Sequence, residues 1–312
     1  MIRNVLEHLA SQEYEHDFDK KALDALEGTP GLELLVRKFN QHGLERMFRI
    51  NYTGSNIRVS EKNYPDIYEV LKEACKIINL SSLPDLYISW SYNINALTAG
   101  VEQPIIVLNS GAVDLLSREE LLYLVGHEIG HIKSQHVLYH QMAQVLPYLG
   151  EIIGSATLGL GAVVTKVVEL ALLNWQRMSE FTADRAGLLA CQNFDVAISA
   201  LIKMAGIPQK YYEQINVEEF LQQAQEFKSF DYSTMDKLVK MMSIMMSTHP
   251  WTVMRASELK KWMDGGVYDD ILNRHGRMAE LGVPAVRVHC AKCGAKLKGI
   301  ELFCPKCGGK IN

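Results

Sequence analysis

The sequence lacks several features that would place it in common protein classes. Its 32 lysines and arginines are outnumbered by 36 aspartates and glutamates, so the formal net charge is −4. Without an excess of basic residues, the composition gives no support for a nucleic-acid partner. The first residues are polar and acidic, and they lack the apolar core of a secretory signal, which predicts a cytoplasmic protein. The chain also has no internal repeat or low-complexity tract.

Long uninterrupted hydrophobic runs are also missing. Residues 145–173 are almost uncharged, but Glu151, Lys166 and Glu169 divide them, and only 14 uncharged residues separate Glu151 from Lys166. A helix needs about 20 apolar residues to span a bilayer. The favoured interpretation is therefore a buried, glycine-rich helical hairpin. Peripheral membrane contact through 145–173 and true insertion stay open as alternatives.

The remaining composition is that of a globular protein, with 48% hydrophobic and 22% charged residues in 312. Apolar residues at helical spacing before residue 50, at 64–78 and again after 117 predict helices, and short β-branched runs at 86–90 and 104–108 predict strands. We therefore expect a mainly α protein with a small β-sheet (α+β). The expected division is an N-terminal helical segment 1–60, a central domain 61–275, a linker 276–288 and a small tail 289–312.

The central motif is His127-Glu128-Ile129-Gly130-His131. Ser117 and Glu120 have capping-box spacing and predict a helix from about Arg118 into the 130s, so the motif lies within a helix. Residues i and i+4 share one helix face, which lets both imidazoles bind one Zn²⁺ while the intervening glutamate faces the same site. Three polar side chains in an otherwise apolar helix would be costly to bury without such a partner.

A catalytic zinc site usually has three protein ligands, so one more is needed. Glu180 and Asp184 are also spaced i, i+4. Glu180 can ligate while Asp184 accepts a ring N–H from a ligating histidine. The alternative is a solvated helix face that carries charge pairs.

Four of the six cysteines form two C-x-x-C pairs, each followed by glycine, near the C-terminus. Four thiolates at this spacing predict a closed, structural zinc ribbon, which could dock a protein partner; iron is an alternative metal. The predicted ligands are Cys290, Cys293, Cys304 and Cys307. Cys75 and Cys191 stand alone in apolar surroundings, which indicates core packing.

Taken together, these motifs resemble the HtpX-like zinc metallopeptidases, which are related to the CAAX prenyl endopeptidases. The resemblance covers roughly residues 60–260, and it includes residues 95–100 and Thr248-His249-Pro250 followed by Arg255. It implies a gluzincin-type, zincin-like domain with a catalytic Zn²⁺ in addition to the structural one. In that domain, His127, His131 and Glu180 would be the ligands and Glu128 the general base.

Other residues receive weaker assignments. His249 and Arg255 could donate to the oxyanion of the transition state, although residues 248–250 could simply begin a helix. His136 occupies a position that is often histidine in this family, and either a supporting role behind the ligands or a role in helix packing is expected. The strand at 104–108 is expected to offer an edge to an extended substrate. The predicted substrate-binding residues are Asn95, Ala96, Ile105, Ile106 and Val107.

Two functions follow from these patterns. The first is a zinc-dependent endopeptidase that hydrolyses peptide bonds in unfolded or flexible polypeptides. The alternative is a non-catalytic scaffold that uses the zinc ribbon to recruit a partner. The intact Glu128 favours the enzyme, because a scaffold has no evident need for a base.

Overall fold

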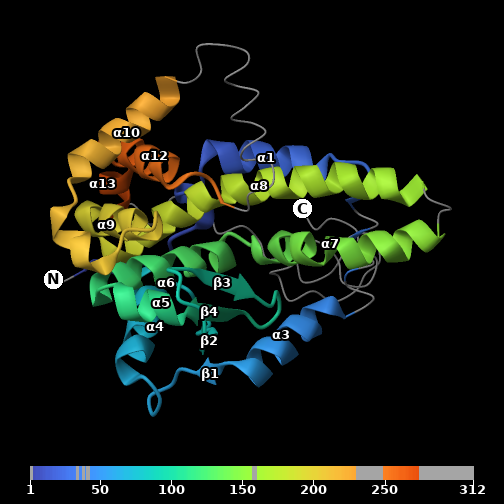
Figure 1. Ribbon diagram of the computed structural model, residues 1–312, viewed down its shortest axis with the longest axis horizontal. Coiled ribbons are helices and arrows are strands. Elements are labelled where there is room, and N and C mark those ends of the chain that lie inside the picture. The colour runs from blue at the N-terminus through green and yellow to red at the C-terminus, as the bar shows by residue number, and fades with distance from the viewer. Residues whose placement is uncertain are drawn as a thin grey trace.

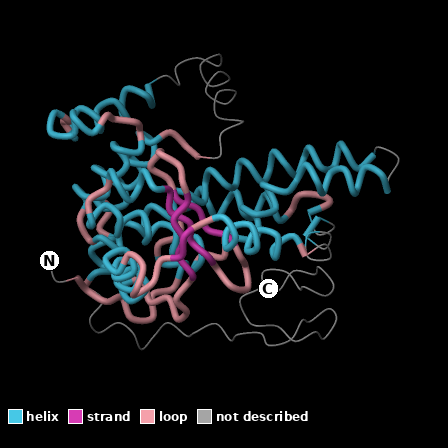
Figure 2. Tube along the Cα trace, turned by 60° about the horizontal axis from the view of Figure 1, so that its bottom comes forward, coloured by secondary structure: helices cyan, strands magenta, loops and turns pink. Residues whose placement is uncertain are grey.

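The computed structural model describes residues 3–32, 35–36, 39, 43–156, 160–229 and 249–273 (Figure 1). The predicted linker and zinc ribbon, including all four ribbon cysteines, lie outside the described residues. Helices dominate the described part, and they surround a small sheet at the centre of the molecule (Figure 2). The expectation of a mainly helical fold with a small sheet is confirmed.

The helices occur along most of the chain. They are α1 (Asp17–Glu27), α3 (Leu44–Ser55), α4 (Pro65–Ile77), α5 (Ser110–Leu115), α6 (Arg118–Lys133), α7 (Val137–Ala156), α8 (Leu160–Cys191), α9 (Phe194–Met204), α10 (Val217–Ser229), α12 (Thr252–Asp264) and α13 (Val267–Leu272). Short 3₁₀ helices cover Ser11–Glu13 and Gln209–Gln214.

The sheet has four strands in the order β1-β2-β4-β3: β1 (Ile57–Arg58), β2 (Asp85–Ser89), β3 (Ala96–Ala99) and β4 (Ile105–Asn109). β2 and β4 are parallel, whereas β1 and β3 pair antiparallel with their neighbours. In the β3–β4 register, Thr98 lies opposite Ile106. The two longer strands match the predicted ones, but the sequence analysis missed β1 and β3.

Alternate residues of β4 enter two different hydrophobic cores, because successive side chains of a strand point to opposite faces. Ile106 and Leu108 pack with α4, α6 and α9, while Ile105 and Val107 pack with the residues of α7 and α8 on the other face. Helices thus cover both faces of β4. This burial on both faces explains why its sequence reads as a continuous apolar run.

The predicted capping box at the start of α6 is confirmed. The Ser117 side chain accepts a hydrogen bond from the Glu120 backbone N–H, and the Glu120 carboxylate accepts one from the Ser117 backbone N–H. Burial raises the pKa of Glu120, but hydrogen bonds from Lys203 and Ser199 outweigh this effect and hold the pKa below its ordinary value. The ionised carboxylate therefore fixes the beginning of the helix that carries the metal-binding motif.

The hairpin expected at 145–173 is formed by the end of α7 and the beginning of α8, which run side by side as a long arm (Figure 1). At its base, Val145 and Leu146 pack in the same core as Val168 and Leu172. Among the described residues, no helix is long and apolar enough to cross a membrane. Membrane contact through 145–173 stays a prediction.

The contact between α6 and α8 sets the position of the metal-binding motif. A Cβ atom at Gly126 would collide with the Cβ of Ala190, and one at Gly130 would lie 2.6 Å from the Cβ of Ala186. The two helices can approach this closely only because these positions lack side chains. The approach brings the ligands on α6 within reach of Glu180 on α8.

We predict that Gly126→Ala lowers the free energy of unfolding by about 1–2 kcal/mol. Overpacking costs about 1–3 kcal/mol, and a gain in helix propensity of up to about 1 kcal/mol offsets part of it. Urea denaturation measures the change. Gly54→Ala is the matched control, because Gly54 is a helical glycine with open space around it and should be unchanged or stabilised. Equal stability of Gly126→Ala and wild type would contradict the close packing.

Candidate metal centre

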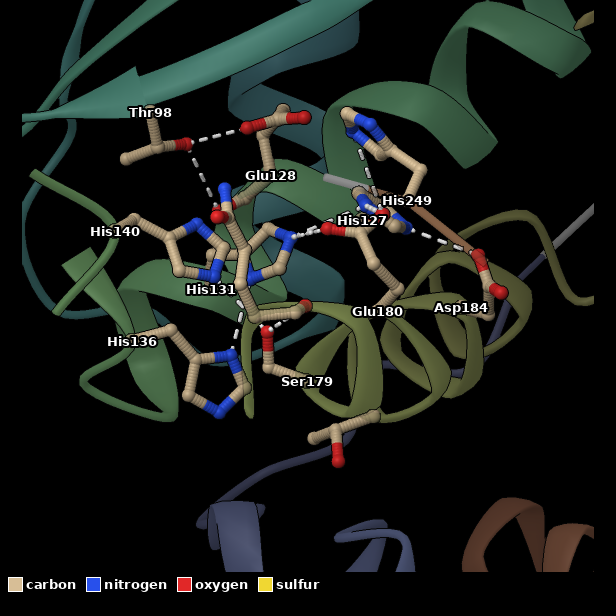
Figure 3. Close-up of polar contacts among 12 residues, drawn as sticks. Thr98, His127, Glu128, His131, His136, His140, Ser179, Glu180, Asp184 and His249 are labelled. Atoms are coloured by element: carbon tan, nitrogen blue, oxygen red, sulfur yellow. Dashed lines mark hydrogen bonds and ion pairs between the residues drawn. The ribbon is translucent and has the colours of Figure 1, made fainter. Parts of the chain in front are cut away.

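Two histidines and one glutamate meet at a buried point between α6 and α8. The Nε2 atoms of His127 and His131 are 3.2 Å apart, and each lies 3.4 Å from a carboxylate oxygen of Glu180. All three side chains are no more than 5% exposed. Figure 3 shows the two rings and the carboxylate directed toward one another. The predicted ligand set is therefore brought together.

The second ring nitrogen of His127 faces Asp184, one turn beyond Glu180 on α8. Nδ1 lies 3.1 Å from Oδ1 of Asp184. The same carboxylate accepts hydrogen bonds from the Tyr123 hydroxyl and, at both of its oxygens, from Arg255. Burial raises the pKa of Asp184, but Arg255 outweighs burial and holds it well below its ordinary value. The ionised Asp184 can only accept, so His127 carries a proton on Nδ1, which leaves Nε2 as the nitrogen that can bind a metal.

The second ring nitrogen of His131 also has a buried polar neighbour. Its Nδ1 lies 3.0 Å from Nδ1 of His136, which is buried. Figure 3 shows His136 behind His131, on the side away from the meeting point. The structure thus places His136 outside the predicted ligand set and in contact with one of its members.

The donor set fits a zinc ion. With protons on the Nδ1 atoms, the two Nε2 lone pairs face each other and the carboxylate of Glu180. Burial raises the pKa of Glu180, but other effects, of which the charge of His249 is the largest, hold the pKa well below its ordinary value, so the carboxylate is ionised. Its Oε2 atom is buried without a hydrogen-bond partner among the described residues. Acceptors that face one another in a dry site need a cation between them, and two imidazoles with one carboxylate are typical zinc ligands.

Glu128 lies beside this centre and contacts a residue that the sequence analysis did not assign. The hydroxyl of Thr98, on β3, donates to Oε2 of Glu128 at 2.6 Å. Burial raises the pKa of Glu128 above its ordinary value. Thr98 lies within the family-like stretch 95–100, and a single polar residue between Leu97 and Ala99 was the only signal for it.

A cavity of about 250 Å³ opens onto the three ligands and Glu128. Asn95, Ala96, His249 and Arg255 also line it. His249 has a side chain 43% exposed, and its Nε2 lies 3.8 Å from Oε2 of Glu180. The predicted base, the three metal ligands and several of the residues predicted to bind the substrate or its oxyanion thus line one cavity.

The remaining substrate-binding residues do not line the cavity. Ile105, Ile106 and Val107 belong to β4, which pairs with β2 on one side and β3 on the other, and each is no more than 1% exposed. The prediction that residues 104–108 offer an edge to substrate is therefore wrong. Because neighbouring strands already occupy both sides of β4, the edge next to the site belongs to β3.

His140 is a further cavity residue that the sequence analysis missed. Its ring centroid lies 4.7 Å from that of His131. The Ser179 hydroxyl donates to the backbone carbonyl of Gln176, so the Nε2–H of His140 donates to the Ser179 oxygen at 2.9 Å. The i, i+4 spacing of His136 and His140 was the available signal.

Comparison with known proteins identifies the family. The model of Peptidase family M48 matches residues 61–263. The chain belongs to this family. It is a zinc metallopeptidase, and His127, His131 and Glu180 form its buried catalytic zinc site. The resemblance expected from the motifs is thus confirmed at the level of the M48 family.

Individual relatives agree with this assignment. The chain is 30% identical over 272 residues to "Plastoglobule-localized metallopeptidase 48, chloroplastic" of Arabidopsis thaliana. The matched region covers 86% of this chain and 77% of that protein. It is 26% identical to a protease HtpX homolog of Pelotomaculum thermopropionicum over 51% of this chain and 65% of that protein. It is 28% identical to protease HtpX homolog 2 of Methanosarcina mazei over 50% of this chain and 60% of that protein. No solved structure matches the chain significantly.

We predict that Thr98→Val lowers kcat/KM for peptide hydrolysis by about tenfold, which corresponds to the loss of one hydrogen bond to a charged group. Valine keeps the shape of threonine, so the strand is retained while the donor to Glu128 is lost. Steady-state kinetics with matched zinc content measure the effect. An unchanged kcat/KM would show that this contact does not matter for the base.

Proposed function

We propose that the metal centre hydrolyses peptide bonds in unfolded or flexible polypeptides, with Glu128 as general base. The observation that carries the proposal is the position of Glu128 in the same cavity as the three ligands, next to the edge of β3 that pairs with no strand in the described part of the chain. When bound, zinc supplies the Lewis acidity that polarises the substrate carbonyl and activates water for attack. The non-catalytic scaffold would leave the buried base without a use.

The side chains divide the remaining work. Glu128 accepts the proton of the attacking water at a carboxylate oxygen and donates it to the leaving amine. Thr98 holds that carboxylate by its 2.6 Å hydrogen bond. His249 is the half-exposed donor at the cavity, and it stabilises the negative charge that develops on the substrate oxygen.

Arg255 receives a different role from the one that its motif suggested. It is 2% exposed, and it donates from Nε and from a terminal nitrogen to Asp184. Its other terminal nitrogen lies 3.7 Å from Oε2 of Glu180. We infer that Arg255 holds Asp184 and Glu180 in place, while His249 is left to contact the substrate.

The substrate is proposed to bind as an added strand along β3. The outer side of β3 pairs with no strand among the described residues, and Asn95 to Thr98 line the cavity. Extended backbone can pair with such an edge without regard to most side chains, which favours unfolded segments and broad sequence tolerance. A folded protein cannot present a free strand to ligands this deeply buried.

A peptide substrate that is N-methylated at the residues pairing with β3 should lose about fivefold in kcat/KM for each ladder bond removed, on the order of 1 kcal/mol. N-methylation removes the donor and leaves the side chain intact. Methylation at the alternate residues, whose N–H groups point away from the edge, is the control. If all methylation positions behave alike, binding along β3 is wrong.

We predict that Glu128→Gln abolishes cleavage of an unfolded protein such as casein while zinc stays bound. General base catalysis contributes about 10²–10⁴-fold, and glutamine cannot accept the proton. Product analysis and zinc content are measured on wild type and variant side by side. Activity that survives in Glu128→Gln would refute the proposed base.

We also propose that Cys290, Cys293, Cys304 and Cys307 hold a second, structural zinc in a ribbon that serves as a docking module. The two C-x-x-C pairs and their following glycines support it. The proposed division is a helical segment 1–60, the peptidase domain 61–275, a linker 276–288 and the ribbon 289–312, and the extent of the family match supports the second of these.

The full chain should contain two zinc ions, and Cys290→Ser combined with Cys293→Ser should contain one. Removal of two thiolates leaves too few ligands for a closed tetrahedral site. Zinc is measured by atomic spectroscopy on purified protein. Cleavage of a short peptide is the control, because it depends only on the catalytic site and should persist. A single zinc in wild type would contradict the ribbon.

A further inference from the structure

The N-terminal segment, which precedes the residues matched by the family model, is tied to the helix that carries Glu180. α1 lies along α8 (Figure 1). The backbone N–H of His16 donates to the Thr182 hydroxyl at 3.0 Å, and Arg185 donates to the carbonyl of Glu15 at 2.8 Å. These contacts hold the start of α1 against the part of α8 that follows Glu180.

A chain of hydrogen bonds runs from this turn to a zinc ligand. Oδ2 of Asp19 lies 3.1 Å from Nε2 of His136 and accepts a hydrogen bond from Thr182 at 2.6 Å. On its other side, Nδ1 of His136 lies 3.0 Å from Nδ1 of His131. Asp19 is 1% exposed and His136 is 3% exposed, so water does not compete for these contacts.

The protons in this chain can be placed from the acceptor at its end. A carboxylate only accepts, so Nε2 of His136 carries the proton that faces Asp19. In the neutral ring, Nδ1 of His136 is then a lone pair, which accepts the Nδ1–H of His131. That assignment leaves the Nε2 lone pair of His131 directed at the metal. The opposite tautomer of His136 would turn His131 round and place an N–H where the metal must bind.

We propose that Asp19 is a positioning residue of the zinc site, which acts through His136 to hold His131 in its ligating tautomer. The proposal rests on the zinc ligand set given above. Each ligand histidine then has a carboxylate behind it: Asp184 supports His127 directly, and Asp19 supports His131 through one intervening ring. The N-terminal segment thereby supplies part of the catalytic domain.

Asp19 keeps its charge although it is buried. Its Oδ1 atom is buried without a hydrogen-bond partner among the described residues. Burial raises the pKa of Asp19, but His136 and Thr182 outweigh burial and hold the pKa below its ordinary value, so the carboxylate is ionised. Removal of the charge therefore affects folding stability as well as zinc binding, and the two effects must be measured separately.

The test compares full-length wild type, Asp19→Asn and Asp17→Asn by zinc titration against a chromogenic chelator. Asp17 is the matched control, because it is an exposed acid in the same first turn of α1. We expect Asp19→Asn to bind the catalytic zinc about tenfold more weakly, as is typical when a ligand loses its supporting partner, and Asp17→Asn to bind like wild type. The four ribbon cysteines are unchanged in every protein, so a difference reports on the catalytic site.

Two further readouts separate positioning from folding. The metal-free Asp19→Asn protein should remain folded at the temperature of the zinc titration, which thermal unfolding of each metal-free protein checks. In a His136→Ala background, Asp19→Asn should weaken zinc binding no further, because its effect passes through the missing ring. An additional tenfold loss in that background would overturn the proposed route.

A histidine ¹⁵N spectrum of zinc-loaded wild type tests the tautomers without any variant. His136 should carry its proton on Nε2 and His131 on Nδ1. A proton on Nδ1 of His136, or wild-type zinc affinity in Asp19→Asn, would overturn the proposal while leaving the ligand set intact. Zinc binding that survives His131→Ala at wild-type affinity would instead refute the ligand set, and the inference with it.

Discussion

The structure depends on one electrostatic constraint: three hydrogen-bond acceptors must face one another away from water. In the ligating tautomers, the Nε2 atoms of His127 and His131 and the carboxylate of Glu180 meet as three acceptors. Such an arrangement is unfavourable unless a cation lies at its centre. Metal binding and folding are therefore coupled, and the energy needed to hold the ligands together must come from the surrounding packing.

That packing is organised around the crossing of α6 and α8. Gly126 and Gly130 let the helices approach, and the hydrogen-bonded cap at Ser117 fixes where α6 begins. The buried carboxylates of Asp184 and Asp19 then set the tautomers of the two ligand histidines, directly for His127 and through His136 for His131. The rigid crossing and the supporting carboxylates preorganise the ligands, so little needs to move when the metal binds.

Much of the centre could be predicted from the sequence because its residues are spaced along helices. His127 and His131 are one helical turn apart, and so are Glu180 and Asp184. Residues at this spacing lie on the same face of a regular helix. The capping residues before Arg118 were equally local. Where geometry follows from a short stretch of chain, the prediction was correct.

The features that the sequence analysis missed depend on contacts between distant elements. Thr98 reaches Glu128 only because β3 pairs beside β4, and the short stretch Ala96–Ala99 has few of the β-branched residues that mark strands. The substrate edge predicted at residues 104–108 was wrong, although the continuous apolar run of this strand already indicated burial on both faces. Asp19 acts across more than a hundred residues of sequence, and no local pattern connects it with His131.

The most direct test of the account is to locate zinc by anomalous diffraction at the zinc edge in crystals of the full chain. We expect a peak about 2.0–2.2 Å from Nε2 of His127, Nε2 of His131 and a carboxylate oxygen of Glu180. A peak bound instead by His136 and Asp19, or by His140, would contradict the ligand set on which the proposed chemistry rests.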